Sequence, residues 1–397
     1  MMAAAAAAES GAKVILIEKN KRLGKKLLLT GNGRCNITNA EFNLKKLVAN
    51  YGKGGKFLFH AFFVLNPQKT IDFFRQLGIK TKIENNKRVF PVSEKAEDVT
   101  AALKKYLLKK HVLISLNSFV SKVNLKQNRI EKLMIGNKEI TAKNYIFCTG
   151  GKSYPATGST GDGFNWARKI GHSISELSPA LTPINLKRNG MEKLQGLTLG
   201  GVGINVFHNN KKYIQETGDI LFTHFGLSGP VILNISKEIG ELIKQGSVKI
   251  CLDLFPYLNE QDLNNKIAGK INKNPKKIVK SLLADFMPRK LASLFIKNSG
   301  IKVGKQIGGM AREERNAIAK FLKNIEFEAD KLSGFNYAMI TSGGVPLKEI
   351  DDKTMKSKII DNLFFCGEII DIDGKTGGFN LQACWSTGYL AGKSAIN

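Results

Sequence analysis

The first twenty residues, MMAAAAAAESGAKVILIEKN (residues 1–20), decide the expected fold. Residues 1–10 predict the body of a helix, which Gly11 ends. Residues 14–17 predict a buried strand that ends at Glu18. An acidic residue that closes the second strand of a Rossmann unit accepts hydrogen bonds from ribose hydroxyls of a dinucleotide. Small alanine side chains suit a first Rossmann helix, because they allow it to approach a strand closely.

The glycine fingerprint G-x-G-x-x-G should lie just before such a helix, and the sequence does not contain it. We therefore expect that Met1 is an internal methionine of a longer parent. The usual strand–turn–helix length puts ~15–20 residues in front of it. A surface glutamate after an ordinary strand is the alternative interpretation of Glu18.

Composition narrows the class of protein. The chain has 397 residues, 43% of them hydrophobic, which predicts a globular protein of two or three domains. No apolar run approaches the ~20 residues that span a bilayer, and the alanine-rich start lacks the basic region of a signal peptide. We expect a cytoplasmic protein without membrane attachment. The net charge of +28 would attract polyanions non-specifically, although the lysines are spread along the chain as on solvated faces.

Five cysteines are scattered without a CxxC pair or zinc-like spacing, at Cys35, Cys148, Cys251, Cys366 and Cys384. This spacing predicts five reduced thiols, mostly buried. It also argues against a flavin disulfide reductase, which needs a redox-active cysteine pair beside the flavin. The histidines have no metal spacing, so no metal site is expected.

Segments with helix patterns and segments with strand patterns alternate along the chain. Helix and strand patterns to residue 110 are followed by β-rich runs over 112–151, which predict a small antiparallel meander and then a buried strand at 145–148. Strand-like segments from about residue 185 predict a β-barrel or sandwich, and residues 259–323 become lysine-rich helices. Strand patterns return after residue 331, and a final helix follows them. The sequence predicts a nucleotide-binding α/β unit split by a β insert that contains a helical insert.

Two glycine-rich stretches favour ligand chemistry. In TGNGRCNITN (30–39), Gly31 and Gly33 allow the backbone to approach a ligand, and Arg34 can pair with a diphosphate. In FFCGEIIDIDGKTGGFNLQACWSTG (364–388), a carboxylate after a buried strand can bind ribitol hydroxyls, which indicates Glu368. The helix that starts near Asn380 would direct its N-terminus toward an electron-rich ring edge. Ordinary turns without a ligand are the alternative for both.

These motifs, with RVFPVSEKA (88–96), FCTGGKSYPATGSTGDG (147–163), LFTHFGLSGPVIL (221–233) and TSGGV (341–345), resemble the YhiN/BaiN-type flavoproteins. The resemblance runs from residue 1 to about 395. It implies an α/β fold, a glutathione-reductase-like FAD-binding Rossmann domain interrupted by a β-barrel insert with a small helical subdomain. We expect the FAD-binding domain at 1–184 and 342–397, the barrel insert at 185–341, and the helical subdomain at 259–328.

The resemblance also implies FAD as the cofactor, and it assigns cofactor-binding roles to the matching positions of this sequence. Ribose would be bound at Glu18 with Lys19 beside it, adenine against the backbone of Val120, and ribitol at a Gly-Glu pair. The implied cofactor-binding residues are Glu18, Lys19, Gly31, Gly33, Arg34, Cys35, Asn36, Val120, Thr149, Gly150, Gly151, Gly367, Glu368, Gly377, Gly378, Phe379, Asn380 and Leu381.

The expected activity is an FAD-dependent oxidoreductase that moves hydride or electrons between the flavin and a small organic substrate. A reductase of activated C=C bonds and an oxidase of amines or amino-ketones both fit, with NAD(P)H as a transient reductant. His224 and Tyr154 are the catalytic candidates, and a structural role is the alternative for each. Three other hypotheses remain: a flavin-dependent RNA-modifying enzyme, a non-catalytic flavin-binding redox sensor, and a fragment that binds nothing.

Overall fold

The computed structural model describes residues 1–187, 191–302 and 304–396. Its contacts divide the chain into two compact units. Unit 1 comprises Met1–Ala180 and Gly334–Asn397, and unit 2 comprises Leu181–Ser333. Unit 1 was expected to comprise residues 1–184 and 342–397, so its two inner bounds differ from the expected ones by 4 and 8 residues. Each unit has a hydrophobic core of its own.

The parallel strands of unit 1 form two pairs. β1 (Ile15–Ile17) pairs with β5 (Leu113–Ser115), and β9 (Tyr145–Phe147) pairs with β18 (Leu363–Phe365). Residues 112–116 therefore do not belong to the meander expected from the sequence. β1 was also expected to be buried, yet Ile15 is 38% exposed and Leu113, opposite it, is 69% exposed. The difference arises because β5 is the only described strand beside β1.

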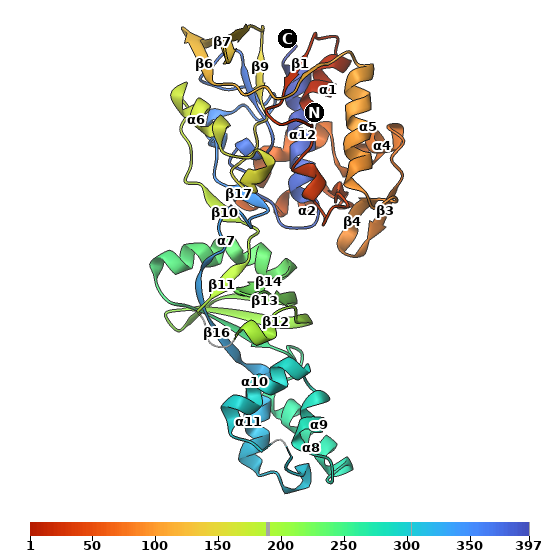
Figure 1. Ribbon diagram of the computed structural model, residues 1–397, viewed down its shortest axis with the longest axis vertical. Helices are drawn as coiled ribbons and strands as arrows, with labels where there is room; N and C mark the ends of the chain where they lie inside the picture. Colours follow the sequence, from red (N-terminus) through yellow and green to blue (C-terminus); the bar gives the residue numbers. More distant parts are fainter. Residues whose placement is uncertain (188–190, 303, 397) are drawn as a thin grey trace. The chain divides into compact units, whose positions relative to one another are not determined.

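Two helices from opposite ends of the chain pack together in unit 1. α1 (Met2–Glu9) lies beside α12 (Phe379–Ser394), as Figure 1 shows. A Cβ on Gly392 would come within 2.3 Å of the carbonyl oxygen of Ala3. Glycine on α12 and alanines on α1 thus permit approach at backbone distance. The alanines were expected to let α1 approach a strand, and the element that they approach here is a helix.

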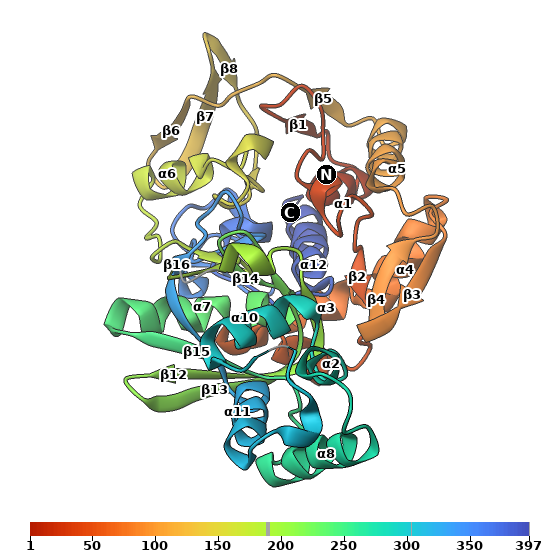
Figure 2. The same cartoon turned by 60° about the horizontal axis from the view of Figure 1, so that its bottom comes forward.

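Smaller elements complete unit 1. The antiparallel sheet β2-β4-β3 and the meander β6-β7-β8 are separate three-stranded sheets, both visible in Figure 2, and β10 pairs with β17. Asn66 caps α4 by accepting from the backbone N–H of Lys69 at 2.9 Å, with Pro67 as the first helical residue. The bounds are β2 (Thr38–Asn39), α2 (Leu44–Ala49), α3 (Phe59–Val64), α4 (Pro67–Gln76), β3 (Thr81–Glu84), β4 (Arg88–Pro91), α5 (Ala96–Lys109), β6 (Lys122–Lys126), β7 (Arg129–Ile135), β8 (Lys138–Ile140), α6 (Asp162–Lys169), β10 (Ser178–Ala180) and β17 (Ile340–Ser342).

Unit 2 is built on a closed barrel with the strand order β11-β14-β13-β12-β15-β16. Its strands are β11 (Ile184–Leu186), β12 (Thr198–His208), β13 (Lys211–Phe222), β14 (Gly226–Ser228), β15 (Val248–Asp253) and β16 (Ile325–Leu332). Between β15 and β16 the chain forms helices α8 (Glu260–Lys273), α9 (Val279–Ala284), α10 (Arg289–Ser299) and α11 (Arg312–Lys323), all drawn in Figure 1. The barrel and its helical insertion match the predicted architecture. Helix α7 (Pro230–Gln245) was not expected.

Two negative findings hold for the described residues. No helix there combines the length and the apolar character that crossing a membrane requires. The same residues contain no group of three or more histidine, cysteine, aspartate or glutamate side chains placed to hold a metal ion.

Candidate cofactor site

Two segments that the sequence predicts to bind a cofactor meet where parallel strands end. Phe147 of β9 lies opposite Phe365 of β18, so the residues that follow them meet at one edge. A Cβ on Gly151 would lie 2.6 Å from the Oε1 atom of Glu368. The TGG segment after β9 and the Gly-Glu pair after β18 are therefore adjacent, and only glycine fits at position 151.

Glu368 has a fixed position at this edge. Its Oε2 atom accepts from the Nζ of Lys26 at 2.6 Å, and its Oε1 atom accepts from the backbone N–H of Thr341 at 2.8 Å. Lys26 is a site residue that the sequence reasoning missed, because it stands in a short lysine cluster interpreted as solvated surface. No spacing signal could link two residues 342 positions apart.

The expected ribose-binding residue, Glu18, directly follows β1, and the next two residues contact a second glycine-rich loop. Its Oε1 atom accepts from the backbone N–H of Asn20 at 2.9 Å and from the Asn20 side-chain amide at 2.8 Å. That amide also donates to the carbonyl of Thr157 at 3.0 Å. Lys19 donates to Thr160 at 2.6 Å and pairs with Asp162. The end of β1 is thus joined to the segment 157–162.

The loop 30–39 lies against the turn before α12. The Asn39 side-chain amide donates to the carbonyl of Gly377 at 3.0 Å. Gly378 has a φ of +103°, and a Cβ there would lie 2.4 Å from the carbonyl oxygen of Thr38. Two stretches that the sequence singled out separately thus form one structure at the N-terminus of α12, which no side chain caps.

Polar atoms without partners support a bound FAD at this site. Among the described residues, the buried side-chain oxygens without a hydrogen bond include Oδ1 of Asn36 and Oγ1 of Thr149, with three others elsewhere at Asn124, Thr182 and Asn205. Leaving such a group unpaired costs about 1–3 kcal/mol. A Cβ on Gly33, whose φ is +84°, would meet no atom within 4 Å, so the space on that side of the glycine is open, while its carbonyl accepts from the backbone N–H of Ala96 at 2.9 Å. Asn36, Thr149 and the glycine backbone therefore fit a polar cofactor.

Two residues of the loop have other partners than those expected. Arg34 pairs with Glu84 at 3.1 Å and Glu94 at 3.5 Å, and its guanidinium lies 3.9 Å from the centre of the Phe90 ring. Its charge is thus already matched, and its pairing with a diphosphate stays a prediction. Cys35 is fully buried, and burial raises the pKa of its thiol to about 12. That thiol remains neutral at physiological pH.

Other carried-over residues hold the backbone in place. The Asn380 side chain exchanges two hydrogen bonds of 2.8 Å with the backbone of Gly374, which closes the turn before α12. The carbonyl of Phe379 accepts from the hydroxyl of Tyr51 at 2.6 Å. Val120 is buried, and Leu381 packs at the edge of a neighbouring core cluster. Direct contacts of these residues with FAD stay predictions.

The two catalytic candidates lie in different units. His224 belongs to unit 2, where it is exposed between β13 and β14 with its ring centre 4.3 Å from that of Phe225. Tyr154 belongs to unit 1, is half-buried, and has a φ of +52°. Its backbone N–H donates to the carbonyl of Phe335 at 3.0 Å. The catalytic role of either residue stays a prediction.

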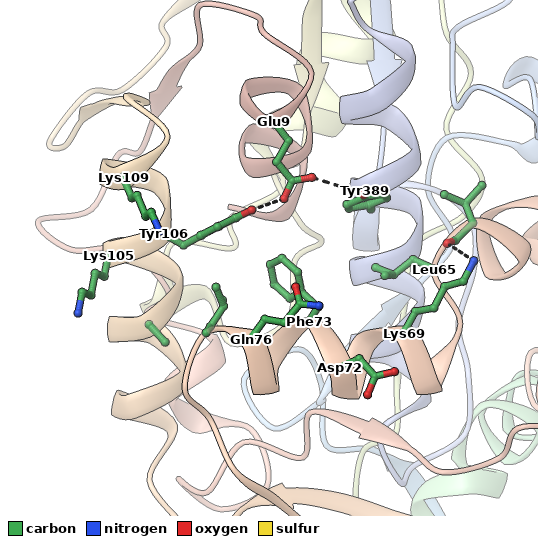
Figure 3. Close-up of a pocket in the computed structure, with 13 residues that line it drawn as sticks. Glu9, Leu65, Lys69, Asp72, Phe73, Gln76, Lys105, Tyr106, Lys109 and Tyr389 are labelled. Atoms are coloured by element: carbon green, nitrogen blue, oxygen red, sulfur yellow. Dashed lines mark hydrogen bonds between the residues drawn. The ribbon is translucent and has the colours of Figure 1, made fainter.

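One pocket in unit 1 lies away from these residues. It has a volume of about 800 Å³ and is lined by α1, α4, α5 and α12, as Figure 3 shows. Inside it the hydroxyl of Tyr106 donates to Glu9, and that of Tyr389 approaches the same carboxylate at 3.3 Å. Burial and the bond to Glu9 raise the pKa of Tyr106. None of the expected cofactor residues lines this pocket.

Comparison with known proteins gives full-length relatives. The 3-dehydro-bile acid delta(4,6)-reductase of Clostridium scindens is 28% identical over 99% of this chain and 95% of its own length. The ribosomal RNA dihydrouridine synthase of Haemophilus influenzae is 30% identical over 99% of this chain and 95% of its own. Among solved structures, the 3-ketosteroid-delta4-(5alpha)-dehydrogenase of Rhodococcus jostii RHA1 shares the fold, with a TM-score of 0.51, 15% identity, and coverage of 100% of this chain and 94% of its own.

The family described as HI0933-like protein Rossmann domain matches residues 1–394. This match agrees with the resemblance inferred from the motifs and with the barrel-interrupted α/β architecture. The chain belongs to the HI0933-like family of FAD-binding Rossmann proteins and is an oxidoreductase of the flavoenzyme class.

Proposed function

We propose that this protein is a reductase of a carbon–carbon double bond conjugated with a carbonyl group, with hydride from FAD in its reduced form and a proton from solvent. The observation that supports it most directly is the joining of loop 30–39 to the N-terminus of α12, at Gly378 and Thr38. The uncapped N–H groups and positive dipole end of α12 would stabilise negative charge at a bound ring edge. Bound FAD supplies the hydride chemistry.

The chain's own residues position the cofactor in this proposal. Glu368, with Lys26 beside it, would bind the ribitol hydroxyls, and Asn36 and Thr149 would pair their unpartnered oxygens with cofactor donors. Glu18 would bind the ribose. NADH or NADPH would reduce the flavin and leave before the substrate binds.

The names of the relatives favour reduction over amine oxidation. A delta(4,6)-reductase and a dihydrouridine synthase act on different molecules, yet each name describes the addition of hydrogen to a ring double bond near a carbonyl. That shared chemistry is the part that we transfer to this chain. Such a double bond occurs in two classes of substrate, steroid enones and the uracil base of RNA.

An anaerobic reoxidation assay tests the proposal. The full chain is loaded with FAD, reduced with NADPH or NADH, and mixed with a 4-en-3-one steroid, while flavin absorbance is recorded. We expect reoxidation with the enone and none with the matched saturated 3-ketone. Reoxidation by oxygen with aminoacetone as the reductant, and no reaction with any enone, would favour the oxidase. Bound FAD that no donor and acceptor pair turns over would favour a redox sensor.

A uracil base in ribosomal RNA is a second candidate substrate. Two features favour it: the net charge of +28 and the Haemophilus influenzae relative that is named as a ribosomal RNA dihydrouridine synthase. If RNA is the substrate, unmodified rRNA reoxidises the reduced flavin and gains two hydrogens per modified base by mass spectrometry. Its affinity should also fall steeply with salt, because bound phosphates release counterions. RNA that binds without reoxidising the flavin would contradict this candidate.

A further inference from the structure

Two cysteines that are far apart in the sequence meet at the end of paired strands. Cys148 follows β9 and Cys366 follows β18, and the backbone N–H of Cys366 donates to the carbonyl of Phe147 at 3.1 Å. Their Sγ atoms lie 2.9 Å apart. Neighbouring strands are spaced at about 4.8 Å, which is within the Cα separation of disulfides, about 4.4–6.8 Å. The backbone at this point can therefore accommodate a disulfide.

The two thiols differ in the way that thiol–disulfide exchange requires. Cys148 is exposed, and its hydrogen bond with Cys366 lowers the pKa of the Cys148 thiol. Cys366 is 2% exposed, and the same bond together with burial raises its pKa. Burial raises the pKa of Cys384 to about 12 and that of Cys251 to about 11. Cys148 is thus the accessible nucleophile, and Cys366 stands directly behind it.

We propose that Cys148 and Cys366 form a reversible disulfide at the edge of the cofactor site, with a small-molecule disulfide such as oxidised glutathione as the oxidant. The Cys148 thiolate attacks one glutathione sulfur, which forms a mixed disulfide and releases one glutathione thiolate. Cys366 then loses its proton to solvent and attacks the Cys148 sulfur, which releases the second glutathione. In sum, two protein thiols are oxidised to one disulfide, and one oxidised glutathione is reduced to two thiols.

This bond would lock the residues that carry the cofactor site. Thr149 directly follows Cys148, and Gly367 and Glu368 directly follow Cys366. The proposal concerns the thiols alone and does not depend on the reaction proposed above. It differs from the expectation, drawn from the spacing of the cysteines, of five reduced thiols without a redox-active pair beside the flavin.

The test is to treat the full native chain with excess oxidised glutathione, to unfold it and alkylate the remaining thiols, and to map peptides by mass spectrometry. Of the five cysteines, three should remain alkylated, with Cys148 joined to Cys366 and no glutathione adduct. Dithiothreitol should restore all five. The variant Cys366→Ser should instead retain one glutathione on Cys148, because the resolving thiol is gone. Cys148→Ser should leave the buried Cys366 unreacted.

Two matched controls separate this pair from its neighbours. Cys251→Ser, in β15 of unit 2, and Cys384→Ser, in α12, should form the same bond as the native chain. A bond between Cys366 and Cys384, a stable glutathione adduct on native Cys148, or five alkylated thiols after treatment would overturn the proposal. Tryptophan fluorescence checks that each variant is folded, and the mapping of the native chain decides the matter if one is not.

Discussion

Replacing Gly392 with alanine tests the contact between the two helices from opposite ends of the chain. The added methyl carbon would lie 2.3 Å from the carbonyl oxygen of Ala3 and 2.8 Å from the Cβ of Ala6. Ordinary contacts between such atoms are about 3.5–4.0 Å, so α1 must move away by roughly 1 Å. Overpacking of this kind costs about 1–3 kcal/mol, and backbone atoms cannot rotate aside as a side chain can.

The gain in helix propensity partly offsets that cost. Alanine is better than glycine in a helix interior by about 1 kcal/mol. We therefore expect Gly392→Ala to lower the free energy of unfolding of unit 1 by up to about 2 kcal/mol. Gly388, one turn earlier in α12, is the matched control, because a Cβ there would lie 3.4 Å from the nearest atom. Gly388→Ala should raise the free energy of unfolding by up to about 1 kcal/mol.

Urea titration followed by tryptophan fluorescence measures both changes. The two tryptophans of the chain are Trp166 and Trp385, and both lie in unit 1. The signal therefore reports the unit that contains α1 and α12. If Gly392→Ala were as stable as Gly388→Ala, or more stable, the close approach of α1 to α12 would be refuted.

Three further outcomes are expected. Thr149→Val removes a buried hydroxyl without a partner, so the cofactor-free protein should be as stable as the native chain or more stable. The same change should weaken FAD binding about tenfold. Equal FAD affinity of the two proteins in a flavin fluorescence titration would contradict a contact between Thr149 and FAD. Glu368→Gln should weaken FAD binding about 10- to 100-fold, since hydrogen bonds to a charged group are worth about 1.5–3 kcal/mol, while the matched change Glu349→Gln should not. Burial lowers the pKa of His172 below 6.5, so the unfolded chain binds a proton at this histidine more readily than the folded chain, and unit 1 should lose stability as pH falls through that value. Urea titrations at several pH values should show a smaller loss of stability for His172→Gln than for the native chain. The same dependence of stability on pH in both proteins would assign the loss to other groups.

Periodicity and turn residues predicted much of the architecture. The apolar run from residue 247 to 254 became β15 of the barrel, and the helical pattern at 311–322 became α11. Local patterns could not show which strands pair, so residues 112–116 were assigned to the meander although β5 pairs with β1. Helix α7 was missed because its sequence starts in an apolar glycine- and proline-containing motif, and it buries an apolar face against the barrel.

The site was predictable only where its residues form motifs. The strand-end glycines and Glu368 stand in continuous stretches, and the structure brings those stretches together. Lys26 and the partners of Arg34 are contacts of sequence-distant residues, which no spacing reveals. The same limit applies to Cys148 and Cys366, which are 218 positions apart. An argument from cysteine spacing excludes local pairs and says nothing about pairs formed by the fold.

The pairing of α1 with α12 also determines the order in which the protein can fold during synthesis. Unit 2 is one continuous segment and emerges complete from the ribosome before α12 is made. The side of α1 that faces α12 must wait for that helix, which at about 5–20 residues per second means roughly 20–80 s. The α1 residues beside the glycines of α12 are Met2, Ala3, Ala6 and Ala7, whereas Ala5 packs with Leu23, Leu107 and Val112, which are made early. The three alanines among those that wait expose little apolar area, which limits aggregation of the nascent chain while the barrel folds first.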